Sequence, residues 1–205
     1  MQNKNLVDGR WEMVDAQTEG DIARIVFRQI LDGDRRKFIA QSNDSDTGGG
    51  ARDLRFRAWP KMQGTLRKLF PGARTENRKR GTSTSLQVYI GHFHWMQKGK
   101  IVSREALLEP PTDARANEAR ITRVHEYHCF TIDEPEKGTG RLLALFVQKK
   151  DGTVWPFVIT EHSLEHDDWN PGVAEFLLSA LNASRPERQA AYGFSDFETG
   201  KKFVR

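Results

Sequence analysis

The chain has 205 residues, of which 37 % are hydrophobic and 29 % charged, and its formal net charge is +4. Five tryptophans and twelve phenylalanines can fill the core of one domain, and a single cysteine excludes an intrachain disulfide. No apolar run approaches the ~18 residues that span a bilayer, and the first twenty residues lack the apolar segment of a signal peptide. We therefore expect a cytoplasmic protein without a membrane partner, in which one domain (21–184) follows an N-terminal extension (1–20) and precedes a loosely held polar tail (185–205).

The first predicted element is a helix over residues 21–31. The apolar residues Ile22, Ile25, Val26 and Ile30 recur there at the spacing of one helical face.

A polar, glycine-rich loop (42–53) follows a short predicted strand (37–41). The next stretch, LRFRA (54–58), alternates apolar residues with Arg55 and Arg57. This alternation predicts a half-buried strand whose arginines point to solvent.

A short helix (61–70) is expected next, ended by a Pro-Gly pair, and a basic linker (72–83) follows it. The segment TSLQVYIGHFHW (84–95) alternates like a strand, with a change of phase at Gly91 that predicts a bulge. A further extended run is expected over residues 119–131.

The strongest local pattern is a pair of apolar runs on either side of Asp151-Gly152, a dipeptide typical of a two-residue hairpin turn. The first run (142–147) is almost continuously apolar, which indicates a strand covered on both faces. Asn170-Pro171 then predicts the start of a helix. Its predicted core residues are Val173, Phe176, Leu177 and Leu181. Together these elements predict an α+β fold: a mostly antiparallel, barrel-like domain of about six or seven strands with flanking helices.

Enzymatic chemistry finds little support in the sequence. The six histidines form three close pairs (92/94, 125/128 and 162/166), but no cysteine cluster accompanies them, so no metal or other cofactor is expected. The acidic and lysine residues of DEPEK (133–137) lie in a loop-like setting, whereas metal-dependent nucleases hold such groups on adjacent strands. Two alternatives remain open: an endonuclease with an unrecognised active site, and a protein-binding regulator whose basic surface binds an acidic partner.

Charge is concentrated in one part of the chain. Residues 52–80 contain ten basic and two acidic side chains, a local net charge of +8, so the rest of the chain sums to −4. Such an excess attracts polyanions. Two other places, the glycine-rich loop (42–53) and ARANEARITR (114–123), contain both hydrogen-bond donors and acceptors. This mixture is typical of side chains that read base edges.

The order of several short motifs adds to this interpretation. They are SND and TGG (42–49), LFP (69–71), a strand start near Ser85, NEARITR (117–123) and GTGRLLA (138–144). With this order and spacing, roughly residues 23–181 resemble the N-terminal effector-DNA-binding domain of the EcoRII restriction endonuclease family.

That resemblance implies a DNA-binding pseudobarrel with two protruding arms that grip the major groove, here residues 42–55 and 117–123. It places a basic cleft position at Arg120 and an acidic one at Glu118. The chain departs from the family at Gly50, where the family has histidine, and around Ala114 and Ala116, where it has further polar residues, so the base preference is expected to differ.

The resemblance also implies a free-standing recognition domain of a restriction-modification or anti-phage system. The nuclease domain of EcoRII-like enzymes has no counterpart here, so we expect no catalytic residues. Double-stranded DNA is the expected partner, and a separate nuclease subunit is a second candidate. The predicted DNA-binding residues are Ser42, Asn43, Asp44, Arg52, Arg55, Arg57, Arg78, Lys79, Arg80, Arg115, Asn117, Glu118, Arg120 and Arg123.

Overall fold

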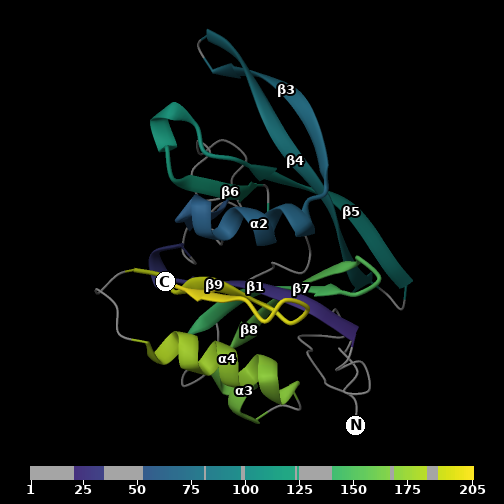
Figure 1. The fold of residues 1–205 in the computed structure, drawn as a ribbon, viewed down its shortest axis with the longest axis vertical. Coiled ribbons are helices and arrows are strands. Elements are labelled where there is room, and N and C mark those ends of the chain that lie inside the picture. The colour runs from purple at the N-terminus through teal and green to yellow at the C-terminus, as the bar shows by residue number, and fades with distance from the viewer. Residues whose placement is uncertain are drawn as a thin grey trace.

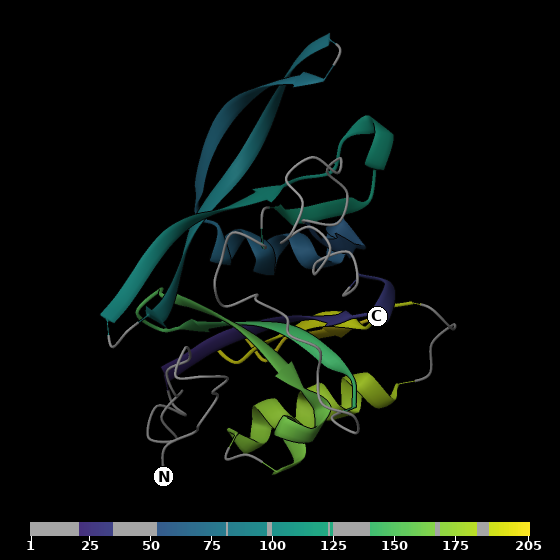
Figure 2. The same cartoon turned by 180° about the vertical axis from the view of Figure 1, so that it is seen from behind.

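The computed structural model describes residues 21–34, 53–80, 82–97, 100–122, 124, 140–166, 169–183 and 189–205 (Figures 1 and 2). These ranges form a mixed α+β structure in which ten strands build one curled, half-barrel sheet. The strands are β1 (Ile22–Ile30), β2 (Leu54–Arg57), β3 (Gly72–Arg80), β4 (Thr82–Gln97), β5 (Lys100–Glu109), β6 (Glu118–Thr122), β7 (Leu142–Lys149), β8 (Val154–Thr160), β9 (Tyr192–Asp196) and β10 (Lys202–Val204). The helices are α2 (Trp59–Leu69), the single-turn η2 (Asp113–Arg115), α3 (Glu161–His166) and α4 (Pro171–Asn182).

The strand order is β10-β9-β1-β7-β8-β4-β5-β6-β2, and β3 pairs with β4 outside this path. Every pairing is antiparallel except that of β4 with β8, where a parallel bridge joins Phe93 to Val154. Phe56 of β2 packs edge-on against Tyr192 of β9, with 6.2 Å between the ring centroids. Because β2 and β9 lie near opposite ends of the order, this contact requires the sheet to curl back on itself.

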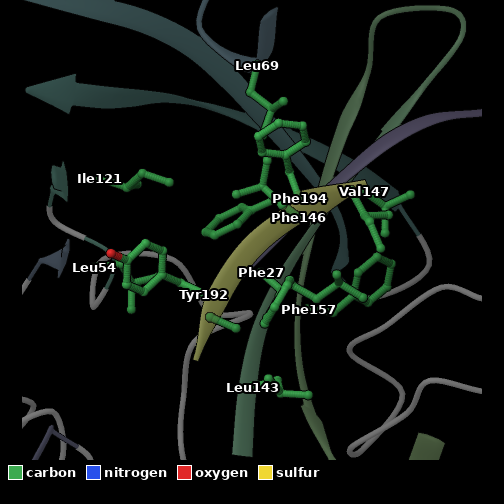
Figure 3. Close-up of a cluster of buried hydrophobic side chains, with 14 of the residues drawn as sticks. Phe27, Leu54, Leu69, Ile121, Leu143, Phe146, Val147, Phe157, Tyr192 and Phe194 are labelled. Carbon is green, nitrogen blue, oxygen red and sulfur yellow. The ribbon is translucent and has the colours of Figure 1, made fainter. Parts of the chain in front are cut away.

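Helices cover both faces of the sheet centre. On one face, Phe93 of β4 packs between Phe70, just after α2, and Phe146 of β7. On the other, Phe27 of β1 packs edge-on against Phe176 of α4, with 5.8 Å between the centroids. Figure 3 shows Phe27, Phe146 and other side chains of this continuous core. None of the helices in the described ranges is both long and apolar enough to cross a bilayer.

The sequence prediction for residues 21–31 was wrong, because this segment is strand β1 and not a helix. Its residues pair with β7 on one side and with β9 on the other. The first six residues are all buried, since α4 covers one face of the strand and the curled sheet covers the other. A strand buried on both faces loses its alternation, and its apolar residues then fit helical spacing by chance.

Two further segments were assigned too little structure. The supposed basic linker is β3, which forms a long antiparallel hairpin with β4. The supposed polar tail contains β9 and β10, and β9 is buried along its whole length beside β1. These additions raise the number of strands above the six or seven expected. The 1–20 extension and the 37–41 strand lie outside the described residues.

The predicted bulge at Gly91 is absent. Ile90, Gly91 and His92 pair in unbroken register with Leu107, Ala106 and Glu105. A Cβ atom at Gly91 would lie 2.3 Å from the carbonyl oxygen of Leu69, at the end of α2. Glycine is therefore required there for the close approach of helix and strand.

Other local predictions agree with the structure, apart from the length of the β7–β8 turn and the extent of the 119–131 run. β2 alternates as expected, α2 ends before Pro71, and the β7–β8 hairpin turns at Asp151-Gly152. The hairpin loop has three residues instead of two, since Lys149 and Thr153 still pair through a 2.9 Å backbone hydrogen bond. α4 begins as predicted, with the Asn170 side chain accepting from the Val173 amide at 3.1 Å, and buries its predicted core residues. Of the run over 119–131, β6 covers the beginning, and residues 125–131 lie outside the description.

Candidate nucleic-acid interface

The β2–β6 pair presents charged side chains on its outward face. Arg55 pairs in register with Arg120, and Arg57 pairs with Glu118. The intervening residues of both strands are buried in the core. We call Arg55, Arg57, Glu118 and Arg120 the arginine face, since directly paired residues of a sheet project to the same side.

Glu118 organises this face. Its Oε1 accepts from Arg120 Nε at 2.9 Å, and Arg120 Nη2 lies 2.8 Å from the same oxygen. Arg57 Nε and Arg55 Nε lie farther from the carboxylate, at 3.6 and 4.0 Å. Burial alone would raise the pKa of Glu118, but the hydrogen bond from Arg120 and the nearby guanidinium charges outweigh it and lower that pKa below its usual value. Glu118 is therefore an ionised acceptor at neutral pH.

The three arginines are not equally available to a ligand. Arg120 is 14 % exposed and has Asp53 as a second partner at 3.6 Å. Arg55 is 38 % exposed and Arg57 is 67 % exposed. The face thus offers donors at its solvent edge and an ion pair that holds its centre in place.

One residue next to this face was missed by the sequence analysis. Arg28 of β1 is 12 % exposed and pairs with Asp34 at 3.2 Å. Burial lowers the pKa of Arg28, and the nearby Asp34 opposes this effect. The positive charge of Arg55 lowers the pKa of Arg28 further, because the two guanidinium groups repel each other. Richness in β-branched residues was the available signal that residues 22–30 form a strand and bring Arg28 here.

The predicted second arm is only partly a protrusion. Residues 118–122 are strand β6, held in the sheet between β2 and β5. The connection before it, which contains η2, is the part that projects. Within it, Arg115 contacts the buried Glu109 at 3.3 Å, and the Asn117 side-chain oxygen accepts from the Trp59 amide at 2.9 Å. Asn117 therefore supports the start of α2, contrary to a purely base-reading role for its side chain.

The β3–β4 hairpin carries the second basic group. Arg78, Lys79 and Arg80 are the last three residues of β3, opposite Thr84, Ser83 and Thr82. Their backbone is placed, and their side chains are outside the description. Nearer the sheet, Arg74 is 2.7 Å from both Glu76 and Glu105, so its charge is compensated locally.

Five predicted residues lie outside the described ranges: Ser42, Asn43, Asp44, Arg52 and Arg123. The DEPEK segment, His125, His128 and Cys129 are outside them as well. In the ranges that the structure covers, no three His, Cys, Asp or Glu side chains come together as metal ligands.

A second ionic cluster has Arg24 and Asp196 at its buried centre and the part-exposed Lys68 and Glu198 at its rim. We call Arg24, Lys68, Gln148, Asp196 and Glu198 the buried network. Asp196 accepts from Lys68 Nζ at 2.9 Å and from Arg24 Nε at 3.3 Å, and Arg24 also donates to Gln148 and Glu198. It ties β1, β7, β9 and α2 together.

No protein-family model, curated protein or solved structure matches this chain significantly.

Proposed function

We propose that the protein binds double-stranded DNA in a sequence-dependent way, with the arginine face as its base-reading surface. One observation carries this proposal: three guanidinium groups and an ionised carboxylate share one outward face of a paired strand ladder. Arginine donates in a bidentate manner to guanine, and glutamate accepts from the cytosine amino group. A surface that bound only the phosphate backbone would need basic side chains and no carboxylate such as that of Glu118.

The spacing of the ladder suits a duplex. Arg55 and Arg57 are two residues apart on β2, a separation of about 6.7 Å along an extended strand. This is close to two base-pair steps of about 3.4 Å each. The backbone of both strands is fixed by ladder hydrogen bonds, so little backbone remains to be ordered on binding.

The arginines divide the work. Arg57 and Arg55 contact DNA first because they are the more exposed. Arg120 reaches a base edge only while Glu118 holds its guanidinium in one orientation, as a hydrogen-bonded neighbour fixes a recognition side chain.

The finer assignment follows from the sequence resemblance. It makes the curled sheet a DNA-binding pseudobarrel like that of the EcoRII N-terminal domain, and the chain a recognition module of a restriction-modification or anti-phage system that acts with a separate nuclease subunit. The glycine-rich loop before β2 would be one arm, and the η2 connection with the start of β6 the other.

Selection from a pool of randomised duplexes tests the proposal. We expect enrichment of a short G/C-containing site and its loss in the double variant Arg55→Gln/Arg57→Gln. The matched control is Lys150→Gln/Lys201→Gln, which removes two exposed charges from other parts of the molecule. A wild-type protein that binds all duplexes equally, or none at low salt, would refute sequence reading.

A further inference from the structure

The β3–β4 hairpin extends beyond the sheet as a free-standing ribbon. β4 pairs with β5 only from Tyr89 onward, whereas its pairing with β3 continues to Thr82. Residues 74–80 and 82–88, which we call the ribbon, therefore pair only with each other among the described strands. Figures 1 and 2 show it rising from the body at the same end of the long axis as η2.

Where the structure describes its side chains (residues 74–77 and 85–88), the ribbon is mostly exposed. Arg74, Thr75 and Asn77 are exposed on β3, and Ser85 and Gln87 are exposed on β4. Glu76 and Leu86 are half-buried, and Val88 at the root is fully buried. A two-stranded ribbon that packs against no hydrophobic core is at best marginally stable by itself. The ribbon therefore contributes little to the stability of the domain.

Its charge increases toward the tip. Arg74, near the root, is compensated by Glu76 and Glu105. Beyond Glu76, the ribbon contains three basic residues, Arg78, Lys79 and Arg80, and no acidic one. The opposite strand contributes the small hydroxyl residues Thr82, Ser83, Thr84 and Ser85.

We propose that the ribbon is a separate DNA-contacting element that lies in a groove of the duplex and lengthens the footprint beyond the arginine face. This inference rests on the proposed function. A two-stranded ribbon fits the major groove, which is about 12 Å wide. At about 3.4 Å per residue, the seven β3 residues of the ribbon reach roughly 24 Å, so the ribbon can contact DNA beyond the base pairs that the arginine face covers.

A polyanion is favoured over a second copy of the chain. The outer edge of β3 has no partner among the described strands, but its charged residues would face the same charges of another copy. The phosphate backbone supplies the opposite charge at regular spacing, and hydroxyl groups of serine and threonine add hydrogen bonds to phosphate oxygens.

The decisive variant is Arg78→Gln/Lys79→Gln/Arg80→Gln, compared with Lys100→Gln/Lys150→Gln/Lys201→Gln, which removes the same charge elsewhere. Duplex affinity is measured over a range of salt concentrations, and contacted nucleotides are mapped by hydroxyl-radical footprinting. We expect the slope of log K against log salt to fall by about 2–3 in the tip variant, with a footprint shortened on one side and an unchanged base preference. The control should keep the wild-type footprint.

A second variant replaces residues 76–86 by Asn-Gly, which closes the hairpin directly after the Thr75–Gln87 pair with a two-residue turn. It should fold with a wild-type denaturation midpoint and show the same shortened footprint. If both variants keep the wild-type slope and footprint while wild type binds DNA, the ribbon proposal is wrong and the proposed function stands. If wild type itself binds no duplex, the proposed function has failed as well. Salt-sensitive capture of an acidic protein by the ribbon, without duplex binding, would also overturn the proposal.

Discussion

The buried network and the arginine face use the same chemical groups for different ends. In the buried network the Arg24 and Asp196 side chains are 8 % and 3 % exposed, and each forms hydrogen bonds with more than one partner. In the arginine face, Arg57 is 67 % exposed and its Nε lies 3.6 Å from the Glu118 carboxylate. The comparison teaches that exposure and completeness of pairing, more than composition, separate ions that hold a fold from ions that remain available to a ligand.

The largest effect is expected from breaking the buried network. Asp196→Ala leaves the buried Arg24 with the half-exposed Glu198 as its remaining carboxylate partner and removes the Lys68 contact, so it should lower the free energy of unfolding by about 3–5 kcal/mol. Urea denaturation followed by tryptophan fluorescence measures the loss. Glu198→Gln is the control: Glu198 is 43 % exposed, so it should cost less than about 1 kcal/mol. Equal losses would show that the two carboxylates do not differ in role.

The pH dependence of stability should report the same network. Burial would raise the pKa of Asp196, but hydrogen bonds from Lys68 and Thr199 and the charge of Arg24 lower it from 3.8 to about 2. A pKa depressed in the folded state adds stability above the unfolded value and loses it as the pH falls. About 2 kcal/mol should therefore disappear between roughly pH 4 and pH 2. The free energy of unfolding, measured by urea denaturation at several pH values in this interval, should depend less on pH for Asp196→Asn than for wild type. An unchanged pH dependence would contradict the assignment.

Arg120, at the centre of the arginine face, is expected both to pair with Glu118 within the fold and to contact DNA. Arg120→Ala is expected to weaken binding to the preferred duplex by roughly 1–3 kcal/mol, the range typical of a base-edge contact. Arg120→Lys keeps the charge but loses the two-pronged contact with Glu118, so it should restore nonspecific affinity without restoring the base preference. Fluorescence anisotropy on matched and scrambled duplexes separates these outcomes.

The smallest effect is expected at the solvent edge of that face. Arg57→Gln should leave the free energy of unfolding within about 0.5 kcal/mol of wild type and weaken duplex binding by about 1 kcal/mol. A clear loss of stability would place Arg57 with the structural ions and remove the contrast between the two clusters.

Local structure was predictable where an element has one face buried in the core and the other in solvent. Arg55 and Arg57 alternate with Leu54 and Phe56 because only one side of β2 is covered, and Asn170 signals a helix start by its own chemistry. The same alternation predicted that Arg55 and Arg57 lie on the solvent side of β2, as the structure shows.

Long-range packing hid the rest. β1 is covered on both faces, so its pattern carried no period of two. In β9, Gly193 looks like a flexible tail residue, yet a Cβ atom there would lie 2.1 Å from the Phe203 carbonyl oxygen. Asp196 likewise looks solvated until Arg24 and Lys68 are brought to it. Such requirements come from residues far away in the chain, which no short window of sequence contains.

The position of β1 between β7 and β9 has a consequence for biosynthesis. The Arg24–Asp196 contact spans 172 residues of sequence, so a growing chain exposes a long apolar strand edge until its last partner has been translated. Non-local pairing of this kind slows folding and leaves the nascent protein open to aggregation. Truncations before residue 192 should therefore depend on chaperones for solubility.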